Sequence, residues 1–335
     1  MTRASAGAPL VTGTLFALAA GLMWGLVFIG PLLLPEYPAT LQAFGRYIAF
    51  GLIALPLAGF DRSKLAQLTR ADWLEALKLG LVGNVVYYLL LASAIQRAGG
   101  PLPTMLIGTL PVVIAITSNL RAAGAGARTE LRLPWAQLLP SLALIAAGIA
   151  LVNHVELQHL RADPKADMAR YVLGAVLAVG AVACWTWYPI RNADWLRAHP
   201  DRSPRGWATA QGLATLPLAL LGYAATWIWS AASGSAFAMP FGPRALDFVL
   251  LMFAIGLLAS WLGTLCWNEA SQRLPPTLSG QLIVFETLAA LSYAFLLRNS
   301  VPQAGTLVGV ALLVAGVVWA VRTQPASASA DAHPN

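Results

Sequence analysis

Apolar residues fill most of the chain in runs of roughly 20 residues, and short polar segments separate these runs. A helix of that length, rising 1.5 Å per residue, crosses the ~30 Å hydrocarbon core of a bilayer. The pattern predicts an all-α membrane protein with ten transmembrane helices and no large soluble domain. The expected spans are residues 11–34, 39–58, 76–96, 102–120, 135–153, 171–190, 207–229, 246–268, 278–297 and 305–321.

The composition supports this class. Hydrophobic residues make up 58% of the chain and charged residues 10%, with a mean hydropathy of +0.67, whereas soluble domains carry roughly 25% charged residues. The first apolar run is longer than the core of a signal peptide, so we expect it to be retained as a helix after a short cytoplasmic segment at 1–10. Residues 323–335 are small and polar, which predicts a disordered cytoplasmic tail.

The net charge of +7 bears on membrane topology. If the N-terminus is cytoplasmic, 14 of the 21 Lys and Arg residues fall in inner segments and 6 in outer segments. Positive residues accumulate on the cytoplasmic side of membrane proteins. We therefore expect a multi-pass protein of the cytoplasmic (inner) membrane with both termini in the cytoplasm, and the basic residues require no nucleic-acid partner.

The chain matches itself weakly at fixed offsets. A shift of 176 residues aligns 80–97 with 256–273, a shift of 161 aligns the first and sixth spans, and a shift of 168 pairs Gly148 with Gly316. These matches fall in the same order in two halves of five helices, and an odd number makes the second half enter the membrane from the opposite face. The sequence therefore predicts two inverted five-helix repeats, 11–155 and 171–322, with a substrate site near the midplane between them.

Short motifs stand at fixed places in this topology: Ala20-Gly21-Leu22-Met23-Trp24-Gly25 in the first span, Arg46-Tyr47 in the second, Pro111 in the fourth and Phe285-Glu286-Thr287 in the ninth. Taken with the ten spans, these motifs resemble the drug/metabolite transporter superfamily of the EamA type. The resemblance covers nearly the whole chain, 11–322. It departs at Thr287, where Pro is usual, and at Leu297-Arg298, where Gly-Glu is often seen. The resemblance implies an exporter of amino acids and related metabolites, or of amphiphilic drugs.

Two charged residues, Arg46 and Glu286, fall well inside predicted spans, where an ionised side chain costs about 2.5–3.5 kcal/mol. Arg46 is expected ~9 Å below the outer boundary. It either snorkels to the headgroups or faces a central cavity, where it would attract a substrate carboxylate or pair with Glu286. Glu286 is expected ~12 Å into the ninth span. It is either a buried acid bonded to Arg46, Gln281 or backbone, or a group that couples protons or binds a substrate ammonium.

Six aromatic residues and Asn84 lie deep in the predicted spans; the aromatic residues are Trp24, Tyr87, Tyr88, Trp185, Tyr188 and Trp261. They are either core packing or the wall of a cavity for apolar, aromatic or cationic ligands. The predicted substrate-binding set is Arg46, Asn84, Tyr87, Tyr88, Trp185, Tyr188, Trp261, Gln281 and Glu286. Trp207 is close to a span end, so we expect it in the aromatic belt at the membrane surface.

Other polar residues have simpler interpretations. Glu269 precedes Arg273 by four residues, the favourable order for an ion pair on one helix. Cys184 and Cys266 fall in apolar spans and are expected to be free thiols. The spans hold no nucleophile arrangement and no metal-ligand cluster, and the chain has no G-x-x-x-x-G-K-[ST] motif. We therefore expect neither an enzyme nor a bound cofactor or metal.

The first functional hypothesis is a secondary-active or facilitative transporter that exports small metabolites, amino acids foremost, by alternating access. Its expected partners are a small-molecule substrate and the lipid bilayer, with protons as the candidate coupling ion. The alternative is multidrug efflux of amphiphilic cations, favoured by the deep aromatics and the buried acid. An intramembrane enzyme is disfavoured by the missing catalytic cluster, and a membrane scaffold by the repeat.

Overall fold

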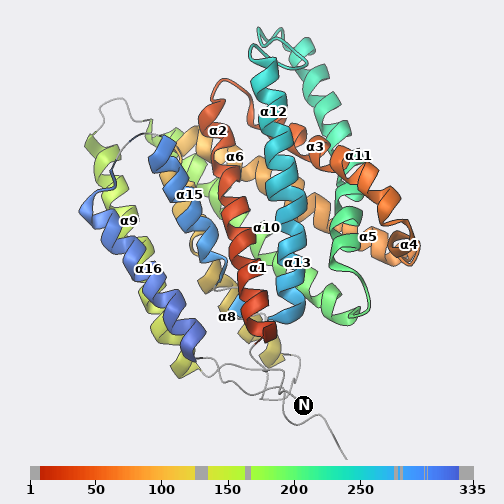
Figure 1. The fold of residues 1–335 in the computed structure, drawn as a ribbon. Coiled ribbons are helices and arrows are strands. Elements are labelled where there is room, and N and C mark those ends of the chain that lie inside the picture. Colours follow the sequence, from red (N-terminus) through yellow and green to blue (C-terminus); the bar gives the residue numbers. More distant parts are fainter. Residues whose placement is uncertain are drawn as a thin grey trace, which may run out of the picture.

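The computed structural model describes residues 8–124, 135–162, 167–274, 278–279, 282–297, 299 and 301–323. Within these ranges the chain is helical and contains no β-strand (Figure 1). The elements are α1 Ala8–Gly25, η1 Leu26–Phe28, α2 Gly30–Leu33, α3 Ala39–Phe60, α4 Arg62–Leu65, α5 Arg70–Leu79, η2 Gly80–Val86, α6 Tyr87–Ala98, α7 Pro101–Ile107, α8 Leu110–Gly124, α9 Trp135–Ala162, α10 Met168–Ala198, α11 Pro204–Ala232, α12 Ala245–Ile255, η4 Gly256–Leu262, α13 Gly263–Arg273, α15 Val284–Leu297 and α16 Ala304–Thr323.

The helices fall where the apolar runs predicted them. Six stretches are long and apolar enough to cross a membrane: Pro9–Leu33, Ala39–Phe60, Arg70–Ala98, Met168–Ala198, Pro204–Ala232 and Ala245–Arg273. Four shorter apolar helices coincide with the remaining predicted spans: Leu102–Ser118, Leu138–Val152, Val284–Leu297 and Ala304–Gly316. The chain is therefore an all-helical membrane protein.

Several helices extend beyond their apolar runs because polar residues cap them. The span predicted to begin at 76 begins at Arg70, where Thr69 and Asp72 form a capping box: each side chain bonds the other residue's backbone N–H, at 3.3 and 2.8 Å. Ser203 caps α11 in the same manner, by accepting a hydrogen bond from the Gly206 N–H at 3.3 Å. Hydrophobicity alone predicts the part of a helix that lies in lipid, and these caps lie outside it.

Two predicted spans are interrupted within the membrane-spanning region. The span predicted at 102–120 breaks at Gly108 and Thr109, where α7 ends and α8 begins just before Pro111. Proline lacks the N–H that a continuous helix needs, which favours a break here. In the span predicted at 278–297, α15 begins only at Val284, so Glu286 lies in the first turn of a helix. Glu286 therefore lies just after a turn at Ile283.

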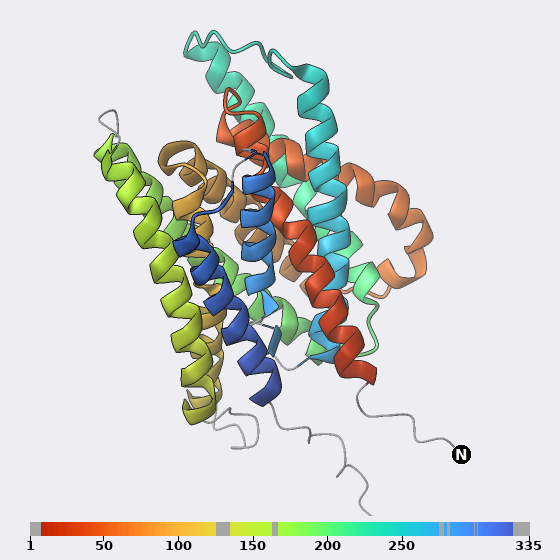
Figure 2. The same cartoon turned by 60° about the vertical axis from the view of Figure 1, so that its left-hand side comes forward.

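The bundle is built from a small number of helix pairings. Helix α1 packs against α13 and α15, and α10 packs against α6, α7 and α8. Helix α3 packs against α11, and α9 packs against α16; the latter pair lies side by side at the edge of the bundle in both views (Figure 1 and Figure 2). The largest buried apolar cluster fills the space between α1, α3, α6, α10 and α11.

Two seven-residue π-helices interrupt the third and eighth predicted spans. They are η2, Gly80–Val86, and η4, Gly256–Leu262, and they lie at positions separated by the 176-residue shift found in the sequence. A π-helix leaves backbone carbonyls without their usual partners and is frequent at functional sites. One such carbonyl, that of Ala259 in η4, accepts a hydrogen bond from the indole N–H of Trp24 at 2.9 Å.

Candidate functional site

Arg46 lies on α3 in the centre of the bundle and is only 4% exposed. Its Nε donates a hydrogen bond to Oγ of Ser260 on η4 at 2.9 Å. Its guanidinium carbon lies 4.5 Å from the ring centre of Tyr88 and 4.9 Å from that of Tyr47, which is cation–π geometry. The Nη1 atom is buried and has no hydrogen-bond partner among the described residues. Arg46 thus faces the protein interior and does not snorkel to the lipid headgroups.

Glu286 is the second buried charged residue of the predicted set and is 1% exposed. Its carboxylate accepts a hydrogen bond from the indole N–H of Trp185 on α10 at 3.3 Å. The position of Glu286 depends on glycine. A Cβ on Gly21 of α1 would lie 3.0 Å from the Glu286 backbone nitrogen, and a Cβ on Gly25 would lie 2.7 Å from the Ala289 Cβ. The Gly21-x-x-x-Gly25 pattern therefore lets α1 pack directly against the first turns of α15.

Three aromatic rings form a continuous stack beside Glu286. Trp185 lies between Tyr87 and Tyr188, with ring centres 4.9 and 4.8 Å away and interplanar angles of 17° and 11°. Trp24 meets Trp185 edge-on at 4.9 Å. The stack needs Gly83 on η2, because a Cβ there would lie 2.1 Å from the Tyr188 ring. These rings give the site a flat apolar wall.

Arg46 and Glu286 each contact an aromatic residue of this region. Arg46 contacts Tyr88, whose neighbour Tyr87 stacks on Trp185, and Trp185 bonds Glu286. Among the described residues, no ion pair joins Arg46 to Glu286. The predicted site therefore contains both charges, and each is held by neutral groups.

Three polar atoms near these charges are buried without a hydrogen-bond partner in the described part of the chain. They are the Arg46 Nη1, the Tyr87 hydroxyl and the Thr287 hydroxyl. An unpartnered buried polar group costs roughly 1–3 kcal/mol, so a site that leaves such groups unsatisfied is suited to a polar ligand that binds them. Arg46 can offer a donor to a carboxylate, and the Tyr87 and Thr287 hydroxyls can donate or accept.

Two residues of the predicted set bond groups other than those named above. Asn84 on η2 donates to the Thr215 hydroxyl on α11 at 3.4 Å. Trp261 on η4 donates to the Thr209 hydroxyl at 3.3 Å, and Thr209 in turn donates to Asp61. Gln281, a further predicted member, lies outside the described residues.

One aromatic prediction is wrong. Trp207, expected in the belt at the membrane surface, is 1% exposed. Its ring stacks on Trp195 at 3.5 Å and its indole N–H donates to the Asn192 side chain at 2.9 Å. The tryptophan is buried because α10 runs to Ala198 and covers the start of α11. Proximity to a span end therefore did not distinguish a lipid-facing ring from one inside the bundle.

A buried amide network escaped the sequence reasoning. The Tyr188 hydroxyl donates to Gln211, Gln211 donates to Asn192, and Asn192 donates to Asn268, at 2.8, 3.0 and 2.8 Å. Asn268 then donates to the carbonyl of Pro204 at 3.1 Å. These residues lie on α10, α11 and α13, which the network ties together within the second half. The available signal was two amides, Gln211 and Asn268, in predicted apolar spans, where each needs a partner.

The remaining sequence predictions can be placed briefly. The Arg273 guanidinium pairs with the Glu269 carboxylate, which confirms that ion pair. Cys184 and Cys266 are free thiols. In the part of the chain that the structure describes, no group of three or more His, Cys, Asp or Glu residues is arranged to hold a metal.

The fold and this site define a multi-pass membrane protein whose helices enclose two charged residues and an aromatic stack. Residues 11–123 match the EamA-like transporter family, and the chain belongs to this family, one of transporters and not of enzymes. It is 55% identical to inner membrane protein YtfF of Escherichia coli (strain K12) over 316 residues, which is 94% of this chain and 97% of that protein. A solved crystal structure shares the fold, with a TM-score of 0.65 and 18% identity, covering 92% of this chain and 96% of that one.

Proposed function

We propose that this protein is an inner-membrane exporter of small zwitterionic metabolites, amino acids foremost. The observation that carries the proposal is the burial of Arg46 and Glu286, two opposite charges that no ion pair joins, each beside an aromatic ring: Arg46 lies over Tyr88, and Glu286 accepts a hydrogen bond from Trp185. An α-amino acid presents a carboxylate and an ammonium group that match these two charges. Its side chain would lie against the stacked rings of Tyr87, Trp185 and Tyr188.

Arg46 and Glu286 are already oriented by neighbouring side chains in a way that would suit binding of an amino acid. Arg46 would receive the substrate carboxylate through its free Nη1, while its Nε remains bonded to Ser260. Glu286 would receive the ammonium and remain oriented by Trp185. Tyr88 supports Arg46 through its ring. Asn84, Trp261 and Gln281 remain predicted members of the site.

Alternating access is the proposed mechanism, and three features support the inverted repeat on which it depends. The π-helices η2 and η4 lie at positions related by the 176-residue shift. A Cβ on Gly148 would meet the Gly309 carbonyl at 2.5 Å, and a Cβ on Gly316 would meet the Ser141 carbonyl at 2.9 Å, which are the same contact under the 168-residue shift. Trp24 and Trp185, matched at 161 residues, meet edge-on, as residues near a twofold axis do.

The membrane and orientation are part of the same proposal. The relative YtfF is named an inner membrane protein, and the excess of Lys and Arg in one set of loops favours cytoplasmic termini. In this orientation the segments near Lys64, Arg191 and Arg205 face the cytoplasm.

Transport by the purified protein tests the function. Proteoliposomes loaded with labelled amino acids should release them faster than protein-free vesicles, and Arg46→Gln should abolish the difference. Glu269→Gln is a matched control, because it removes an ion pair within α13, away from the aromatic cluster. Release that is equal with and without protein, across all classes of amino acid, would overturn the proposal.

Proton coupling is tested at Glu286, the only carboxyl that bonds the aromatic stack in the described part of the chain. Glu286→Gln keeps the size of the side chain but cannot exchange a proton. If protons are the coupling ion, this variant loses dependence on a pH gradient and retains equilibrium exchange of substrate. Gradient-driven transport that is unchanged in Glu286→Gln would refute the coupling role.

A second candidate function, efflux of amphiphilic cations, is favoured by the Tyr87–Trp185–Tyr188 stack beside a carboxylate. It predicts that Glu286→Gln abolishes efflux of an aromatic cation while Arg46→Gln preserves it. The amino-acid hypothesis predicts that both substitutions abolish transport, so one pair of variants separates the two functions.

A further inference from the structure

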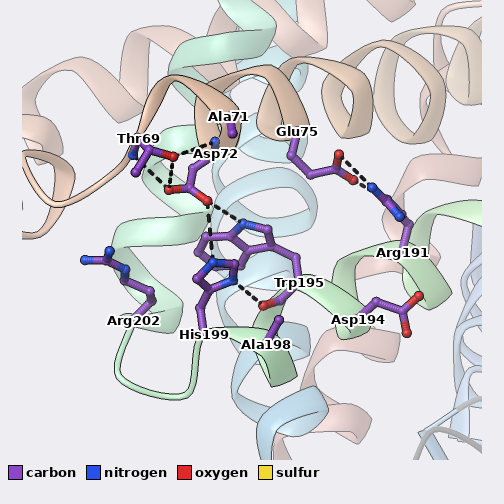
Figure 3. A pocket seen from close by; sticks show the side chains of 10 residues that line it. All are labelled: Thr69, Ala71, Asp72, Glu75, Arg191, Asp194, Trp195, Ala198, His199 and Arg202. Carbon is purple, nitrogen blue, oxygen red and sulfur yellow. Dashed lines mark hydrogen bonds and ion pairs between the residues drawn. The ribbon is translucent and has the colours of Figure 1, made fainter.

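A pocket of about 470 Å³ lies away from the Arg46–Glu286 cluster, where α5 begins and α10 ends. We name this end of the bundle the Asp72 end. Figure 3 shows α5 side chains pointing across the pocket toward side chains of α10. Helix α5 belongs to residues 11–155 and α10 to residues 171–322, so the pocket lies between the two proposed repeats. The lining residues are Thr69, Ala71, Asp72, Glu75, Arg191, Asp194, Trp195, Ala198, His199 and Arg202.

An ion pair spans one side of this pocket. The Arg191 guanidinium donates two hydrogen bonds to the Glu75 carboxylate, from Nε at 2.5 Å and from Nη2 at 3.1 Å (Figure 3). Such a two-point contact fixes orientation as well as distance. Arg191 is adjacent to Asn192, which bonds Asn268 and Gln211 in its own half. The end of α10 is therefore anchored within the second half and reaches across to the first.

A second contact spans the pocket at Asp72. The Trp195 indole N–H donates to the Asp72 carboxylate at 2.9 Å, and the His199 ring lies 3.8 Å from the same oxygen. Asp72 also caps its own helix through Thr69, so it is held rigidly on the first half. Trp195 is fixed on the second half by stacking on Trp207 at 3.5 Å. Both partners are thus preorganised for a contact between the halves.

The charged groups that line the pocket already have partners. Besides the contacts above, Asp194 pairs with Arg121 at 2.7 Å, and Arg202 donates to Gln67 at 2.9 Å. Both of these contacts also join a residue of the first half to one of the second. No buried charge in the lining is left for a ligand, so the charges serve contact between the halves.

The opposite end of the bundle, where α2 ends and α12 begins, carries a related cluster that we name the Tyr37 end. It lies at the top of Figure 1. Tyr37 stacks on Phe248 at 4.8 Å with an interplanar angle of 9°. Arg244 donates to the Glu36 carboxylate at 3.3 Å, and its backbone N–H donates to the Tyr37 hydroxyl at 2.8 Å. This cluster also joins the first half to the second.

The two clusters occupy corresponding places in the proposed repeats. The 176-residue shift maps Asp72 onto Phe248, and the 161-residue shift maps Tyr37 to within one helical turn of Trp195. At each end, an aromatic residue near the end of the first helix of one half (Trp195 in the last turn of α10, Tyr37 just after α2) contacts the start of the third helix of the other half. The chemistry differs, because the Asp72 end relies on carboxylates and the Tyr37 end on a ring stack and one cation.

We propose that these clusters are the two gates of the transporter: Glu75–Arg191 and Asp72–Trp195 close the Asp72 end, and Tyr37–Phe248 with Arg244–Glu36 closes the Tyr37 end. The inference rests on the alternating-access function proposed above and names the contacts that must break in turn. A solute can enter between the halves from the Asp72 end only after α5 separates from α10. Weakening one gate shifts the protein toward the state in which that gate is open and the other is closed.

Hydrogen–deuterium exchange of the full-length protein in lipid nanodiscs tests the gates without any substrate. Glu75→Gln should raise exchange by about fivefold in residues 70–79 and 190–198, and should lower it in residues 30–37 and 244–250. The double variant Glu75→Arg with Arg191→Glu restores the ion pair with reversed sign and should return both ends to wild-type exchange. This rescue also shows that the altered chains fold.

Glu269→Gln is the matched control, because the Glu269–Arg273 ion pair lies within one helix, α13. The gates are overturned if Glu75→Gln and Glu269→Gln show the same exchange at both ends of the bundle. A rise in exchange at both ends of the bundle would also overturn the gates, since it would show that the Glu75–Arg191 ion pair only stabilises the fold. If exchange changes in opposite directions at the two ends but the protein moves no solute, the gates are supported and the transport function is refuted. Failure of the gates is therefore distinguishable from failure of the transport function.

Discussion

Replacing Gly25 by alanine tests the close contact that places Glu286. Gly25 has φ −53° and ψ −26°, which alanine adopts without strain, so only the space around the new methyl matters. That methyl would lie 2.7 Å from the Ala289 Cβ and 2.9 Å from the Ala290 backbone nitrogen. The atoms it meets are helix backbone and a Cβ, neither of which has a flexible end that can turn away. Overpacking of this kind costs about 1–3 kcal/mol.

Gly59→Ala is the matched control, because a methyl at this position on α3 meets nothing within 4 Å. Both variants gain roughly 0.5–1 kcal/mol of helix propensity over glycine, so the difference between them isolates the clash at Gly25. Thermal unfolding in one detergent, followed by tryptophan fluorescence, should place the Tm of Gly25→Ala below that of Gly59→Ala by at least ~2 °C. Equal Tm values would refute the close packing of α1 on α15.

Two further substitutions test the site and its surroundings. Trp185→Phe keeps a ring in the stack but removes the N–H that donates to Glu286. We expect the free energy of unfolding to fall by about 0.5–1.5 kcal/mol if the carboxyl is neutral and by about 1.5–3 kcal/mol if it is charged. The same change made in Glu286→Gln gives the neutral value for comparison, and no effect in either background would contradict the hydrogen bond. Trp207→Ala should cost about 3–5 kcal/mol because it empties a buried site beside Trp195, whereas a lipid-facing belt residue would cost less than ~1 kcal/mol by the same unfolding measurement.

The apolar pattern predicted where the helices lie because lipid imposes a minimum apolar length on each one. It did not predict where they break. The interruption at Gly108 and Thr109 lies just before Pro111, but Pro56, Pro140, Pro189 and Pro217 lie inside unbroken helices, so proline alone does not mark a break. The π-helices at Gly80–Val86 and Gly256–Leu262 leave no mark in hydropathy. The late start of α15 likewise moved Glu286 from the interior of a helix to its first turn.

The candidate site was predictable in composition and less so in geometry. Burial of Arg46 and Glu286 follows from the cost of charge in lipid. The neutral partners that hold them, Ser260 and Trp185, depend on which helices meet, and a single sequence does not state that. The contact of Glu75 with Arg191 was not predicted for the same reason. In the sequence, arginines near span ends indicate topology, and only the packing of α5 on α10 shows that Arg191 contacts the other half.

The proposed repeat explains why self-similarity survives in some positions and is lost in others. Gly13 packs against Leu274 and Gly174 against Ala98, a contact related by the 161- and 176-residue shifts, and the glycines persist because neither leaves room for a Cβ. Asn84 and Ser260 occupy the same place in the two π-helices, yet one bonds a threonine and the other Arg46. If the proposed repeat holds, its two halves carry unlike polar groups at equivalent positions and would present a different surface to solute from each side. The proposed alternating motion could then be symmetric while substrate binding differs between the two sides.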